Sequence, residues 1–147
     1  MRAAAWFLML AGLGEAVPGL IHYFLPDGGA GTIAGIRLGA NAPLVIALFA
    51  WTGAVQIPFG LLLLAIGWRY RQLVPHGLAA VMAERALMAW DGWLGKASRL
   101  GHHPPEHYGS PVMAGLCLIF LIVALRSGDP YGNRTRVSAV RGPRPDR

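Results

Sequence analysis

Four acidic or basic side chains, histidine aside, lie inside long apolar segments of this 147-residue chain, and they are the residues best placed to do chemistry: Glu15, Glu84, Arg85 and Asp91. At the centre of a membrane helix each would cost about 2.5–3.5 kcal/mol, so each needs a partner. Their charges sum to minus two, which an apolar interior does not hold readily. We therefore expect protonation of one or two carboxyl groups, or binding of a cation or cationic ligand.

The spacing of these residues places them on shared helix faces. Glu15 and His22 are seven residues apart, on one face of the first apolar segment. Glu84 and Asp91 repeat this spacing in the third segment, with Arg85 about 100° around the helix from Glu84. We expect Arg85 to pair with Glu15 or Glu84. Three roles stay open: a structural bridge between helices, a ligand or proton site, or charges that face water on a surface helix.

A polar loop near residue 100 holds three of the five histidines. Its candidate metal ligands are His102, His103, Glu106 and His107. Imidazole and carboxylate groups suit Zn, Cu or Ni. The spacing differs from structural zinc patterns, and two prolines limit how the ligands converge, so a metal site competes with a simple solvated loop. The single cysteine, Cys117, excludes an internal disulfide. Phosphate-loop, nucleophile-elbow and HExxH motifs do not occur, and we expect no cofactor.

Four apolar segments would position these residues, and they cover 3–25, 44–66, 73–94 and 108–125. The first two exceed the roughly 20 residues that a membrane-spanning helix needs, and the fourth suffices for a short span. The third carries three charges and either spans or lies on the surface as an interfacial helix. With 54% hydrophobic and only 14% charged residues, the chain differs from soluble domains. We predict an all-α fold, an integral membrane four-helix bundle over residues 1–125.

Two finer expectations concern packing. Gly31, Gly35 and Gly39 repeat every four residues, which predicts a helix packed closely against a neighbour. Trp51 lies deep within the second segment and is expected to pack between helices. The other four tryptophans lie near segment ends, where indole rings favour the membrane interface.

The distribution of Lys and Arg predicts the topology. Four spans place nine basic residues on the side of both termini and three on the other, so both termini are expected in the cytoplasm, at the plasma membrane of a bacterium. Six of the nine lie in 126–147, which is predicted to be a disordered basic tail. Residues 132–136 alternatively match translation across the antisense strand of a transfer-RNA gene. Residues 1–125 carry a net charge of only +2, so no nucleic-acid partner is expected.

One family resemblance is carried by two stretches. Gly35-Ile36-Arg37-Leu38-Gly39 precedes a glycine-punctuated, leucine-rich segment over residues 52–64. This layout resembles the DoxX-like group of small four-span bacterial membrane proteins of unknown function, over residues 3–125. The resemblance implies a four-helix membrane bundle and carries over no catalytic residues. The Glu84–Arg85 pair and the histidine loop depart from the pattern.

Three classes of function follow from these features. The first is a small-ligand-binding protein or an accessory subunit, with the lipid bilayer and other membrane subunits as partners. The second is a membrane enzyme for a lipid, quinone or sterol-like substrate, with Glu15, Glu84 and Asp91 exchanging protons. The third is a proton or cation carrier. A lipid-open cavity at the carboxylates favours the enzyme, a continuous polar path favours transport, and a closed Arg85 bridge favours a structural role.

Overall fold

The computed structural model describes residues 1–127, and this part of the chain is all-helical, as predicted, without any strand. Its four α-helices are α1 (Arg2–Phe24), α2 (Ala42–Arg69), α3 (Val74–Leu94) and α4 (Pro105–Arg126). Each helix covers one of the four apolar segments. The tail predicted over 126–147 lies, beyond Ser127, outside the described residues.

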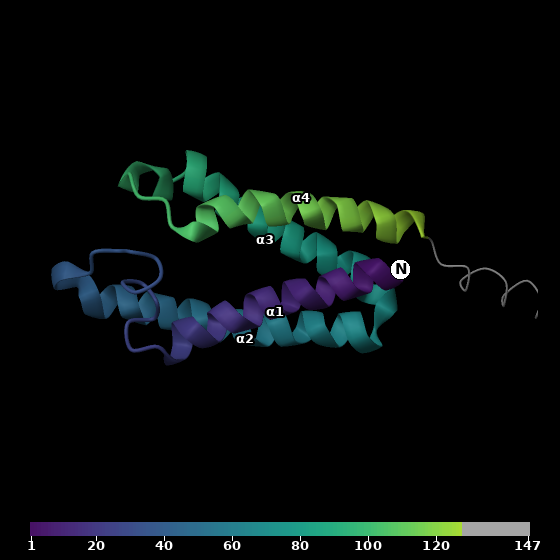
Figure 1. Ribbon diagram of the computed structural model, residues 1–147, viewed down its shortest axis with the longest axis horizontal. Coiled ribbons are helices and arrows are strands. Elements are labelled where there is room, and N and C mark those ends of the chain that lie inside the picture. The colour runs from purple at the N-terminus through teal and green to yellow at the C-terminus, as the bar shows by residue number, and fades with distance from the viewer. Residues whose placement is uncertain (128–147) are drawn as a thin grey trace, which may run out of the picture.

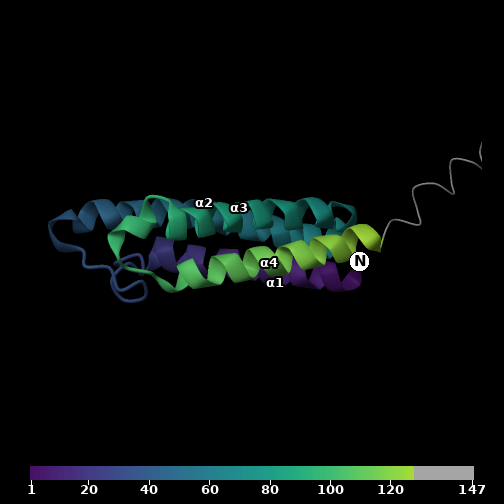
Figure 2. The ribbon, with the colours of Figure 1, turned by 90° about the horizontal axis from the view of Figure 1, so that it is seen from above.

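The four helices run side by side in alternating directions (Figures 1 and 2). α1 packs mainly along α2, and α3 packs mainly along α4, while contacts between these two pairs are fewer. The start of α1, the α2–α3 link and the end of α4 lie at one end, here called the terminal end. The α1–α2 loop and the α3–α4 link lie at the other end, here called the loop end. Two helix pairs therefore enclose an interior that can hold a site.

Glycines bring α1 and α2 into backbone contact. A Cβ atom added to Gly60 would lie 2.5 Å from the carbonyl oxygen of Gly12, and one added to Gly53 would lie 2.5 Å from that of Gly19. Such close approach through small residues is typical of helix pairs in membranes. The prediction that Trp51 packs between helices is wrong: its side chain is 76% exposed, because it lies two residues from Gly53 on the opposite face of α2.

The α1–α2 loop does not form the helix that its glycine spacing predicted over residues 31–39. Gly35 and Gly39 adopt φ angles of +67° and +52°, in the left-handed region that glycine tolerates and an α-helix excludes. Only a short 3₁₀ turn, Gly39–Asn41, precedes α2. The four-residue repeat was therefore a pattern of turns and not of helix packing.

The side chain of Asp27, near the start of this loop, binds backbone groups that follow it in the sequence. Its carboxylate accepts hydrogen bonds from the backbone N–H groups of Gly29 (2.9 Å), Gly31 (3.1 Å) and Thr32 (2.8 Å). These bonds favour the ionised form, so the pKa of Asp27 lies below its ordinary value of 3.8, with the Thr32 N–H as the largest cause. One side chain thus binds three backbone N–H groups of the loop.

The outer surface of the helices is apolar. Three helices, α1, α2 (from Gly39) and α4, are long and apolar enough to cross a membrane, with mean hydropathies of 1.6, 1.8 and 2.2 in their most apolar windows. α3 falls outside this group because Glu84, Arg85 and Asp91 interrupt it. Yet Leu87 and Trp90 of α3 are 71% and 65% exposed. The large side chains therefore point outward on all four helices.

Candidate functional site

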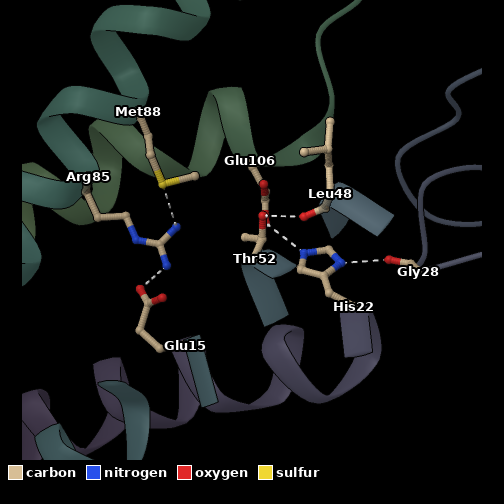
Figure 3. A network of polar contacts seen from close by, with 8 residues as sticks. All are labelled: Glu15, His22, Gly28, Leu48, Thr52, Arg85, Met88 and Glu106. Atoms are coloured by element: carbon tan, nitrogen blue, oxygen red, sulfur yellow. Dashed lines mark hydrogen bonds and ion pairs between the residues drawn. The ribbon is translucent and has the colours of Figure 1, made fainter. Parts of the chain in front are cut away.

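A buried ion pair joins α1 to α3. The Arg85 guanidinium donates through Nη2 to Oε1 of Glu15, and their side chains are only 11% and 1% exposed. Figure 3 shows the two side chains pointing toward one another, with the sulfur of Met88 3.8 Å from the guanidinium Nη1. The pairing expected between Arg85 and one of two glutamates is thus formed with Glu15.

Helix length explains why these two residues meet. Glu15 lies nine residues before the end of α1, and Arg85 lies nine residues before the end of α3. Both helices end at the loop end, so at 1.5 Å per residue each side chain starts about 14 Å below it. That depth is about half of a hydrocarbon core of roughly 30 Å. The sequence therefore places opposite charges at the same level of two neighbouring helices.

Glu84 adds a second carboxyl group beside the pair. It interacts electrostatically with Glu15, Arg85 and Glu106. Glu15 and Arg85 neutralise each other, so an ionised Glu84 would leave this interior group with a net charge of minus one, and a protonated Glu84 would leave it neutral. A group of this kind holds a proton or another cation more readily than an anion.

Polar atoms without partners gather around the ion pair. Among the described residues, the buried side-chain atoms that lack a hydrogen-bond partner are Glu15 Oε2, Gln56 Oε1, Glu84 Oε2, Arg85 Nε and Ser110 Oγ. Each unpaired group in an apolar interior costs about 1–3 kcal/mol. Four of the five belong to the ion pair, to its neighbour Glu84, or to the wall of the adjoining clefts. These four unpaired atoms therefore make this part of the interior the strongest candidate for a functional site.

Ser110 is the site residue that the sequence analysis missed. It lies in the second turn of α4 and is 1% exposed. A signal was available, because it is the only Ser, Thr, Asn or Gln in the apolar segment 108–125. A lone hydroxyl is not by itself informative, however, since it commonly bonds to its own helix backbone. The Oγ of Ser110 makes no such bond.

Two adjoining clefts open beside these residues. The first, here called the Arg85 cleft, measures about 280 Å³ and lies between α1, α3 and α4, with Arg85 and Met113 in its walls. The second, here called the Asp91 cleft, measures about 350 Å³ and lies between α3 and α4. Glu106 and Ser110 line both clefts. The volumes are near the lower end of the range for small-molecule sites.

His22 and Glu106 lie at the loop end of the Arg85 cleft. Nε2 of His22 is 3.9 Å from Oε1 of Glu106, and its Nδ1 is 2.7 Å from the carbonyl oxygen of Gly28 (Figure 3). This contact links the end of α1 to the start of α4. His22 and Glu15 lie seven residues apart in α1 and therefore share one face of this helix, as their spacing predicted.

The four candidate metal ligands are not gathered into one centre. His103 and His107 face each other, with their Nδ1 atoms 3.0 Å apart. His102 instead contacts the carbonyl oxygen of Ala34 at 2.6 Å, and Glu106 contacts His22. Over residues 1–127 no group of three or more His, Cys, Asp or Glu side chains could hold a metal ion. The predicted metal site is therefore not assembled in this arrangement.

Asp91 lies apart from the ion pair. It accepts a hydrogen bond from the backbone N–H of Lys96 at 2.9 Å, beyond the end of α3. It is exposed and contributes to the wall of the Asp91 cleft. Of the carboxylates expected to act together, the structure thus joins Glu15 and Glu84 and leaves Asp91 in a capping role.

No family model, curated protein or solved structure matches this chain. The likeness to DoxX-like proteins therefore stays a prediction.

Proposed function

We propose that this chain is a multi-pass membrane protein that binds a small ligand in the Arg85 cleft. The observation that carries the proposal is the Oγ atom of Ser110, which lies in the wall shared by both clefts, is almost fully buried, and has no hydrogen-bond partner. Buried hydroxyl groups are normally paired. A ligand with one polar group in the cleft would supply the missing bond.

The distribution of polar and apolar side chains supports insertion in a membrane. Thirty large apolar residues of the described part are exposed, whereas Glu15 is buried. On α3, Arg85 faces α1 while Leu87 and Trp90 point outward. A helix lying on the membrane surface would instead turn its charges to water. Four spans fit this pattern better than three spans and an interfacial α3. An even number of spans leaves both termini on one side, for which the Lys and Arg distribution favours the cytoplasm.

An apolar plug favours binding over transport. Toward the terminal end, Leu8, Leu63 and Leu78 are at most 1% exposed and pack together below the ion pair. Phe7 and Phe120 stack at 4.2 Å between ring centroids. A carrier needs a polar path on both sides of its site, and here the polar groups extend only toward the loop end. The cleft is therefore a one-ended binding site.

Native mass spectrometry tests this proposal. The full chain, purified in a mild detergent and released in the gas phase, should carry a bound small molecule in addition to lipid. Ser110→Leu fills the wall shared by the two clefts and should remove that molecule. Thr52→Leu, which likewise replaces a hydroxyl residue by leucine but on the exposed face of α2, should leave it in place. A wild-type protein without any bound molecule, and without thermal stabilisation by a panel of small amphiphiles, would overturn the proposal.

A further inference from the structure

We infer that the terminal end of the bundle binds the head groups of anionic phospholipids. The inference rests only on the membrane insertion in the proposed function and not on ligand binding in the clefts. It starts from the basic residues at the start of α1, at the α2–α3 link and at the end of α4, which Figures 1 and 2 show together at one end of the molecule. These residues are Arg2, Arg69, Arg71 and Arg126.

These four arginines, here called the terminal arginines, have no charged partner in the described part of the chain. All four are exposed. The ion pairs within residues 1–127 are Arg85 with Glu15 and His22 with Glu106, and both lie elsewhere. No Asp or Glu of this range lies at the terminal end. Their positive charge is therefore open to an anion from outside the protein.

The loop end is balanced by comparison. Its basic residues lie in the α1–α2 loop and the α3–α4 link, and they are Arg37, Lys96 and Arg99. Carboxylates of the same loop and of the adjoining ends of α3 and α4 match them in number, and they are Asp27, Asp91 and Glu106. With histidine counted as neutral, the terminal end thus carries all of the excess positive charge of the two ends. The topology prediction counted only Lys and Arg, and the carboxylates make the contrast larger.

Aromatic side chains indicate the depth of the terminal arginines in a membrane. Trp6 and Trp68 are exposed on α1 and α2, and indole rings favour the interface between hydrocarbon and head groups. Arg2 lies four residues beyond Trp6, about 6 Å farther along the helix. Arg69 follows Trp68 directly. Since the head-group layer is about 5–8 Å thick on each side of the hydrocarbon core, both arginines lie at the level of the lipid phosphates.

Lipid fits this surface better than a soluble acidic partner does. The terminal arginines lie directly beside exposed apolar residues, such as Trp68 before Arg69 and Leu125 before Arg126. These neighbours belong to the surface that meets lipid tails in a membrane, so lipid head groups are the nearest anions. A guanidinium binds phosphate oxygens through two parallel N–H···O bonds. Near an anionic membrane surface, each such residue raises the binding constant about fivefold.

Lipid binding measured by native mass spectrometry tests the inference. The full chain in a mild detergent is titrated with phosphatidylglycerol or with phosphatidylcholine of the same acyl chains, and the dissociation constant of the first bound lipid is measured. We expect phosphatidylglycerol to bind at least about fivefold more tightly. The preference should shrink as salt is added, because the contacts are exposed. Inorganic phosphate at the concentration of the lipid should not compete, since it lacks the apolar chains.

Two matched triple variants locate the binding surface. The terminal-end variant combines Arg2→Gln, Arg69→Gln and Arg71→Gln. The loop-end variant combines Arg37→Gln, Lys96→Gln and Arg99→Gln and removes the same number of charges. The terminal-end variant should lose most of the preference for phosphatidylglycerol, and the loop-end variant should keep it. Residues 128–147 are identical in all chains, so a preference that arises there would survive in both variants. Should the terminal-end variant fail to fold, Arg71→Gln/Arg126→Gln replaces it, with a partial loss expected.

The outcomes separate this inference from the proposed function. If the wild type binds both lipids equally, or if the terminal-end variant keeps the full preference, the terminal arginines do not bind anionic lipid and the inference is wrong. Displacement of phosphatidylglycerol by inorganic phosphate or by a polyglutamate peptide would assign the arginines to a soluble anion and would also overturn it. If the chain retains neither lipid and does not insert into nanodiscs, membrane insertion itself fails, and the proposed function with it.

Discussion

Removing Arg85 should destabilise the fold far more than removing either of its glutamate neighbours. Arg85→Met keeps an unbranched apolar stem and deletes the charged guanidinium, which leaves Glu15, 1% exposed, without a counter-ion. Breaking a buried ion pair from one side costs about 3–5 kcal/mol. We therefore expect Arg85→Met to lower the free energy of unfolding by about that amount.

Substituting either glutamate should cost less free energy of unfolding than substituting Arg85, because both glutamates interact with Arg85. In Glu15→Gln the guanidinium can turn to Glu84, with which it interacts electrostatically, so the loss should be smaller, about 1.5–3 kcal/mol, the scale of one charge-assisted hydrogen bond. Glu84→Gln leaves the Glu15–Arg85 pair intact and should change the free energy of unfolding least of the three. The double variant Arg85→Met/Glu15→Gln should recover part of the loss, since no charged carboxylate then remains in the pair.

The assay is reversible unfolding in mixed micelles, followed by far-ultraviolet circular dichroism as the denaturing detergent is increased. Folding free energies of the wild type, the three single variants and the double variant complete a mutant cycle. The test is the order of the variants by their loss of unfolding free energy. If Arg85→Met costs less than about 1 kcal/mol, or if Glu84→Gln destabilises more than Glu15→Gln, the charges are not buried and coupled as described.

Three further predictions concern packing, pH and topology. Gly53→Ala should separate α1 from α2 at a cost of about 1–3 kcal/mol of unfolding free energy, whereas Gly115→Ala, with open space around its Cβ position, should be neutral or stabilising. The loop bonds of Asp27 stabilise the native state above its unfolded pKa of 3.8 and are lost as the pH falls through the lower, native pKa. The protection factors of the amides in residues 29–32, taken against the intrinsic exchange rate at each pH, should therefore fall in acid. Asp27→Asn should abolish this dependence, and a flat wild-type profile would contradict it. A Ser98→Cys label site in a Cys117→Ala chain should react with an impermeant maleimide from outside intact cells; reaction only after lysis would show that α3 does not span.

Hydropathy and helical spacing together predicted the helices and the partners of Arg85. Long apolar segments have few alternatives to helix, and the level of Glu15 and Arg85 follows from counting residues to the helix ends. Their pairing was therefore accessible from the sequence, because an isolated charge at that depth must find its counter-ion. The sequence did not decide between the two glutamates, and only the three-dimensional arrangement shows that Arg85 pairs with Glu15.

Other features depend on contacts that spacing does not encode. The repeat of Gly31, Gly35 and Gly39 is equally compatible with a helix and with turns, and positive φ angles decide for turns. Trp51 faces outward because glycines on the opposite face of α2 make the closer contact with α1. The histidines separate because His102 contacts Ala34 across 68 residues of sequence. Each outcome is set by a tertiary contact and not by local pattern.

The buried pair would also allow a helix as polar as α3 to lie in a membrane, as the proposed function requires. Glu84 and Arg85 would each cost about 2.5–3.5 kcal/mol on their own, and no stretch of α3 compensates for that. Contact with Glu15 would offset the cost of Arg85 only after α1 is in place. In the proposed four-span arrangement α3 would therefore depend on α1 for its insertion, while the more apolar α2 and α4 would not.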